Sequence, residues 1–189
     1  MEIGAVNSIN LQGMDLETAL LAVQSSRANL LETQLKDQIN EVQNRNAQIA
    51  NLNNMVSALN GLVAQYGSGS DDATKIGDGK GISGWDKNEV LSTDSDKAGT
   101  LGYLAKQAGL DLATLGILKD GSFKDVKKGE LNAAIQTLKG QIDALGNSQQ
   151  MDMLRLQSLS NKRNEAFDTM TNFIKKMQDS RSAIIGNMR

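Results

Sequence analysis

Two long segments of this chain repeat apolar residues at spacings of three and four, and a glycine-rich segment separates them. Such spacing places apolar side chains on one narrow face of an α-helix, which is typical of a coiled coil. Neither helix can bury that face alone, and the other helix lies at hand in the same chain. The sequence therefore predicts a mainly all-α fold, an elongated antiparallel coiled-coil hairpin of long N- and C-terminal helices.

The first predicted helix covers 15–66, with Asp15 as its N-cap. At 1.5 Å per residue it would be about 78 Å long, which is too long for a compact domain. We expect a phase shift near Leu30 and polar interruptions at Arg27 and Asn46. Its apolar positions are Leu16, Leu20, Val23, Leu30, Leu35, Ile39, Val42, Ile49, Leu52, Val56, Leu59 and Val63.

The second predicted helix covers 130–189. Gly140 and Gly146 weaken its pattern in the middle, so we expect a bend or a break there. Across both helices, the residues assigned to the intramolecular coiled coil are Leu35, Ile39, Val42, Ile49, Val56, Leu59, Val63, Leu138, Ile142, Leu145 and Leu156.

Several residue types are missing from the chain. It has no Pro, no Cys and no His, and only 3% of its residues are aromatic. The absence of Pro favours long uninterrupted helices. Without Cys and His, the chain lacks disulfides, thiolates, the usual general base and the commonest metal ligand. We therefore expect no enzymatic activity, no cofactor and no metal site.

Charge and hydropathy limit the partners further. The net charge of -2 supplies no basic field for nucleic acid. No segment approaches the roughly 20 apolar residues of a membrane span. The opening segment, 1–14, reads "MEIGAVNSINLQGM" and lacks the charged start of a secretory signal peptide. By composition alone it is a flexible tail, and we expect neither a nucleic-acid partner nor a direct membrane span.

The glycine-rich centre, 67–129, is predicted to form loops and a small, mostly helical cap. Short helical patches are expected over 101–107 and 110–115, and a short hairpin around 117–126. The window 78–89 has the acidic ends of a calcium loop, but Lys80 and Ile82 stand where oxygen ligands belong. "GDGKG" lacks the Ser or Thr that follows the lysine of a phosphate loop. Both stretches are better interpreted as solvated loop.

The C-terminal stripe holds more apolar surface than one partner helix can cover. Phe173 and Ile174 are adjacent, and neighbours on a helix point about 100° apart. Core packing is the usual role of such residues, but here we predict a second contact, with another subunit or a binding partner. The residues assigned to subunit contact and polymerisation are Phe167, Met170, Phe173, Ile174, Met177, Ile184, Ile185 and Met188.

The layout of polar leader, long helix, glycine-rich centre and long C-terminal helix resembles the type III secretion needle-tip and filament proteins of the EspA type. The segments that carry the resemblance are "MDLETALLAVQSSRANLLETQL" and "LSNKRNEAFDTMTNFIKKMQDSRSAIIGNMR". Within that family they look most like the filament-forming tip proteins of Bordetella. The resemblance covers 14–66 and 130–189, and the centre has no matching motif.

The resemblance implies that 1–14 is an uncleaved secretion signal and that the protein is secreted to the bacterial cell surface. It implies a helical homopolymer that extends the secretion needle and conducts translocators or effectors towards the host cell. The partners would be further copies of the chain, the needle subunit and the translocators. A cytoplasmic chaperone would cover the apolar stripes before export, and the loop over 67–84 would face solvent.

Two other functions remain open. A needle-tip cap would sense host contact and dock translocators without polymerising, although such caps often carry an extra N-terminal helical hairpin for which this chain has little room. A flagellin-like or unrelated coiled-coil adaptor is the third interpretation.

Overall fold

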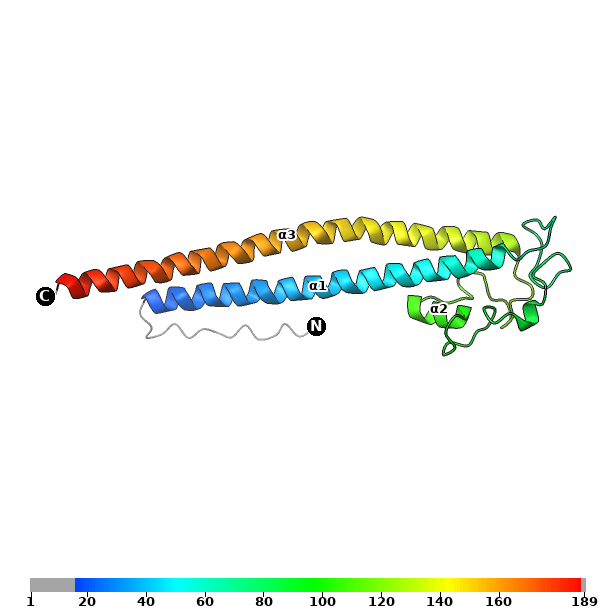
Figure 1. Ribbon diagram of the computed structural model, residues 1–189, viewed down its shortest axis with the longest axis horizontal. Helices are drawn as coiled ribbons and strands as arrows, with labels where there is room; N and C mark the ends of the chain where they lie inside the picture. Colours follow the sequence, from blue (N-terminus) through cyan, green and yellow to red (C-terminus); the bar gives the residue numbers. More distant parts are fainter. Residues whose placement is uncertain (1–15, 188–189) are drawn as a thin grey trace. The chain divides into compact units, whose positions relative to one another are not determined.

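The computed structural model describes residues 16–187 and is mainly helical (Figure 1). Its elements are α1 (Leu16–Val63), the short 3-10 helix η1 (Trp85–Lys87), α2 (Leu101–Ala108) and α3 (Lys128–Asn187). The described residues contain isolated β-bridges but no strand. The two long helices α1 and α3 pack against each other. The predicted all-α helical hairpin is therefore confirmed.

The chain divides into two compact units, and each unit contains part of both long helices. We call 42–150 the capped unit, because it also holds the central segment. We call the described residues 16–41 and 151–187 the two-helix unit. Within the capped unit, Gln149 donates a hydrogen bond to Asn46 over 2.6 Å. Within the two-helix unit, Gln38 donates one to Asp152 over 3.3 Å, so the helices run antiparallel in both units.

Helix α3 continues without a break from Lys128 to Asn187, so a break at Gly140 and Gly146 is excluded, and of the predicted bend or break only the bend stays a prediction. A Cβ added at either glycine would meet nothing within 4 Å. Each glycine costs the helix only about 1 kcal/mol relative to alanine. The buried side chains before and after them repay that cost, because they hold α3 against its partner.

One side of each long helix is buried or half-buried at strictly alternating spacings of three and four. We call these positions the seam. In α1 the seam is Ala28, Leu31, Leu35, Gln38, Val42, Arg45, Ile49, Leu52, Val56, Leu59 and Val63. In α3 it is Leu131, Ile135, Leu138, Ile142, Leu145, Gln149, Asp152, Leu156, Leu159, Arg163, Ala166, Met170, Phe173 and Met177.

The seam contains every residue assigned to the intramolecular coiled coil except Ile39. Ile39 is 42% exposed, because the seam position is its neighbour Gln38. The prediction that Arg27 and Asn46 interrupt the seam is also wrong, because both residues are exposed and lie off the seam. The polar seam residues of α1 are Gln38 and Arg45.

The core of the capped unit lies where the central segment covers the two long helices. Its members from α1 and α3 are Leu52, Met55, Val56, Leu59, Leu62, Leu131, Ala134, Ile135 and Leu138. Its members from the centre are Ile76, Ile82, Leu101, Ala105, Ala108, Leu112, Ile117, Phe123 and Val126. Because Ile76, Gly81 and Ile82 are buried, the expectation that the loop over 67–84 faces solvent is wrong at these three residues, whereas residues 78–80 between them are exposed.

The centre consists mainly of turns and contains few regular elements. Helix α2 begins at the N-cap Thr100, whose side chain accepts from the Tyr103 N–H, and this confirms the patch expected over 101–107. The patch expected over 110–115 is a set of turns instead. The expected hairpin around 117–126 is reduced to one bridge, in which Lys119 and Ser122 exchange backbone hydrogen bonds of 2.9 and 2.8 Å.

Candidate assembly surface

The large exposed apolar side chains of the described chain all belong to the two-helix unit. They are Leu20, Val23, Leu30, Ile39, Met151, Met153, Leu154, Phe167, Ile174 and Ile185. Scattered single apolar residues are normal on a protein surface, but a concentration in one unit marks an interaction surface. The two-helix unit is therefore the candidate functional site.

The same unit has a small core. Its buried apolar residues are Ala28, Leu31 and Ala166, with Leu159 packed against them. Gln38 and Asp152 are also buried on the seam, and Arg155 donates to the Gln38 side-chain oxygen over 3.4 Å. Alanine and polar side chains bury little apolar area, so these positions of the seam contribute less than the leucines of the capped unit.

The residues that the sequence assigned to polymerisation separate into three groups. Met170, Phe173 and Met177 are half-buried and lie at seam positions. Phe167, Ile174 and Ile185 are exposed by 40%, 39% and 68% and lie off the seam. The side chain of Ile184 and the whole of Met188 lie outside the described residues.

Helix α3 continues past the first residue of α1. In the antiparallel register that brings Ala28 and Ala166 into one cluster, Leu16 falls opposite Gln178. From Gln178 to Asn187, every side chain that the structure describes is exposed. This last part of α3 therefore has no α1 residue beside it within the described helices.

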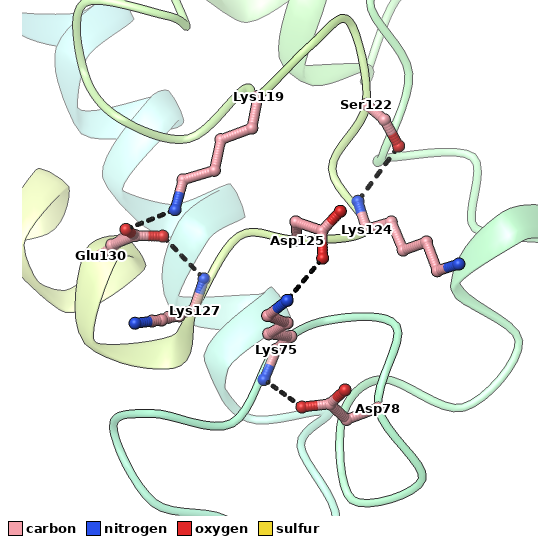
Figure 2. Close-up of polar contacts among 8 residues, drawn as sticks. All are labelled: Lys75, Asp78, Lys119, Ser122, Lys124, Asp125, Lys127 and Glu130. Atoms are coloured by element: carbon pink, nitrogen blue, oxygen red, sulfur yellow. Dashed lines mark hydrogen bonds and ion pairs between the residues drawn. The ribbon is translucent and has the colours of Figure 1, made fainter.

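The capped unit is held by polar contacts at the base of its cap (Figure 2). Lys119 and Glu130 form an ion pair of 2.6 Å, and the Lys127 N–H donates to the other Glu130 oxygen over 2.8 Å. Burial acts to raise the pKa of Glu130, but these two donors outweigh it and the pKa lies below its usual value. Glu130 thereby joins the Lys119 turn to the first turn of α3.

A second ion pair joins two other segments of the cap. Lys75 contacts Asp125 at 2.7 Å, and the Lys75 N–H donates to Asp78 over 2.8 Å (Figure 2). The hydrogen bond and charge of Lys75 lower the pKa of Asp125, while the same contact raises the pKa of Lys75. Both groups are exposed, so this contact positions the 75–77 segment rather than forming a reactive centre.

Tyr66 is the titratable group in the capped unit whose pKa moves furthest. Burial, with the nearby charges of Asp78 and Glu130, raises its pKa to about 12. The Lys128 ammonium lies over its ring, 5.7 Å from the centroid. A tyrosine kept protonated in this way is a packing residue at neutral pH, because proton transfer from it is made harder.

Binding chemistry of other kinds has little support in the described chain. Within 16–187 no group of three or more acidic residues is placed to hold a metal ion. None of the described helices is long and apolar enough to cross a membrane. Comparison with known proteins finds no matching family, no matching curated protein and no matching solved structure.

Val23, Leu30 and Met153 are surface residues that the sequence analysis did not assign to contact, although the sequence contains a signal that identifies them. Val23 and Leu30 are seven residues apart, and so are Phe167 and Ile174. In the two-helix unit these four residues lie off the seam and are exposed, so the seven-residue repeat there marks outward-facing positions.

Proposed function

We propose that this protein is a structural subunit that assembles with further copies of itself through its two-helix unit. The observation that carries the proposal is the contrast within that unit, in which the large exposed apolar side chains surround a core of three buried apolar residues. Covering such a surface is favourable by about 25 cal/mol per Å² of apolar area removed from water. A repeated contact between identical subunits covers it in every copy except those at the ends.

The finer proposal follows the resemblance to EspA-type proteins. The assembly is a helical filament outside the bacterial cell that extends the type III secretion needle and conducts translocators or effectors. The needle subunit and the translocators are its further partners, and a cytoplasmic chaperone covers the apolar side chains before export. Its role is structural rather than enzymatic. Two long helices with an assembly surface in one unit and a folded cap in the other support this proposal.

The alternative is a needle-tip cap that does not polymerise. In that case the exposed apolar side chains of the two-helix unit would be covered by the needle or by translocators. The two functions differ in what the purified protein does alone. A filament subunit associates with itself as its concentration rises, whereas a tip cap stays at a fixed small number of copies.

The test uses the full-length protein, followed by light scattering and negative-stain microscopy over a range of concentrations. We expect filaments, and we expect Ile174→Asp to abolish them because a buried, unpaired carboxylate costs several kcal/mol. Thr169→Asp on another side of α3 is the matched control and should leave assembly intact. Circular dichroism checks that both variants keep their helices. A protein that stays monomeric at every concentration, salt and pH would overturn the proposal.

A further inference from the structure

Helix α1 carries a second periodic stripe on the side that faces away from α3. Its members are Ala19, Val23, Ser26, Leu30 and Thr33, at spacings of four, three, four and three. At 100° per residue this outer α1 stripe is centred roughly 160° from the seam of the same helix. Val23 and Leu30 are exposed by 43% and 57%. A helix with coiled-coil spacing on two opposite faces is built to pack on both of them.

Helix α3 carries a comparable stripe on its flank. The lateral α3 stripe consists of Met153, Gln157, Ser160, Asn164, Phe167, Thr171, Ile174 and Gln178, again at spacings of four and three. It is centred roughly 100° from the α3 seam. All of its members are exposed except Ser160, which is half-buried. The stripe therefore offers apolar side chains at a seven-residue repeat, separated by small or amide side chains.

Neither stripe contains a charged residue. Over 153–178, α3 has the charged residues Arg155, Lys162, Arg163, Glu165, Asp168, Lys175 and Lys176, and all of them lie off the lateral stripe. An exposed helix face of this length normally carries charge, and depletion of charge is the mark of an interface core. The outer α1 stripe stops where Asp37 takes the next position in its repeat.

The distribution of charge also indicates which surfaces of two copies meet. The opposite flank of α3 presents Arg155, Lys162 and Lys176 with one carboxylate, Glu165, so two copies meeting through that flank would bury charged side chains and bring an excess of positive charge together. Two uncharged stripes can meet without that cost. Large and small side chains also alternate along the outer α1 stripe, in which Ala19 and Ser26 are small and half-buried and Val23 and Leu30 are large and exposed.

We infer that the outer α1 stripe of one copy packs against the lateral α3 stripe of a second copy. The inference rests on the proposed function and specifies the surfaces that carry it. The two stripes lie on different helices and point in different directions. Each bound copy therefore keeps one stripe free, so the contact is heterologous and can repeat, and it builds a filament when the rotation between copies does not close a ring.

The test exploits the absence of cysteine from the chain. Two full-length variants, Ser26→Cys and Ser160→Cys, are prepared separately, mixed under assembly conditions and treated with a bis-maleimide that spans about 10 Å, the length of one heptad. We expect a covalent dimer in the mixture and at most a few per cent of that yield from either variant alone. Thr169→Cys replaces Ser160→Cys as the control and should give at least a tenfold lower yield with Ser26→Cys.

The outcomes distinguish a failure of this inference from a failure of the proposed function. If the unmodified protein assembles but the mixture gives no dimer, or the Thr169→Cys control gives as much, the surfaces are wrong and the function stands. Efficient cross-linking of Ser160→Cys alone would show that like stripes meet, which also overturns the inference. If the unmodified protein does not assemble at all, the function and the inference fail together.

Discussion

The two units of this molecule use the same pair of helices in different ways. In the capped unit, the seam residues Leu52, Leu59 and Leu138 are fully or almost fully buried, and the centre covers the flank of the helices beside them. In the two-helix unit, the seam contains Ala28, Gln38 and Asp152, and large apolar side chains are exposed around it. A helix pair is thus completed by its own chain in one unit and left incomplete in the other.

The difference shows how a coiled-coil chain can combine a stable fold with a capacity for assembly. A pair of helices leaves apolar flanks that a third element must cover. In the capped unit that element is the centre, for example Ile76 and Val126 against Leu62 and Leu131 in one core. The two-helix unit has no such segment among the described residues, so a neighbouring copy is the covering element that we propose.

The largest expected effect is on the capped core. Leu59→Ala removes a fully buried side chain and should lower the free energy of unfolding by about 2–5 kcal/mol, because it leaves a cavity. The matched change in the two-helix unit, Leu30→Ala, should cost within about 0.5 kcal/mol, because that side chain is largely exposed. Urea unfolding of the unassembled protein, followed by Trp85 fluorescence and by circular dichroism, measures both. Equal losses would contradict the contrast between the units.

A smaller loss is expected from Gly81→Ala. A Cβ at this position would overlap the carbonyl oxygens of Lys75 and Ile76, so the cap must shift, at a cost of about 1–3 kcal/mol. Gly79→Ala is the matched control, since a Cβ there meets nothing within 4 Å. The same urea experiment compares the two. Equal stability of the variants would mean that the backbone near Gly81 shifts with no loss of free energy. The cap would then be less firmly packed than the seam.

Much of the fold could be predicted from the sequence, because helix pairing depends on local spacing. The spacing of Val56, Leu59 and Val63 identified the α1 seam where every position is apolar. The spacing assigned Ile39 to the seam wrongly, because Ile39 is apolar and its neighbour Gln38 is polar. Only the strict alternation of three and four in the neighbouring turns shows that Gln38 is the seam residue. The break predicted at Gly140 and Gly146 is wrong for a different reason, since a glycine within a helix costs only about 1 kcal/mol, little against the packing of a long helix.

The cap could not be predicted in the same way. Many of its hydrogen bonds close local turns, but those that bring its segments together join residues far apart in the sequence, such as the Ile76 N–H to the Val126 carbonyl over 2.9 Å. No periodicity within 67–129 encodes such a pairing.

The assembly surface lies between these two cases. The adjacency of Phe173 and Ile174 indicated two directions of contact, but only the structure showed that Phe173 belongs to the seam and Ile174 does not. The polymerisation role of these residues stays a prediction.

The smallest expected effect is a pH dependence confined to the capped unit. The pKa of Glu130 is held below its usual value of 4.5 in the folded protein. Its contribution to stability is therefore complete above about pH 4.5 and is lost as the pH falls through the lower folded pKa. Glu130→Gln should cost about 0.5–1 kcal/mol at neutral pH, the usual range for a partly exposed ion pair. It should also flatten the fall in stability between about pH 5 and pH 3.

Companion lysine variants show whether the ion pair is the cause. Lys119→Gln removes the side-chain donor to Glu130 and should flatten the same part of the pH profile. Lys87→Gln, at an exposed position on η1, should leave the profile of the unmodified protein in place. Urea unfolding followed by Trp85 fluorescence at each pH reports on the capped unit, because Trp85 packs against its core. A profile that stays equally steep in Glu130→Gln would mean that other carboxylates, such as Asp125, carry the acid sensitivity of the cap.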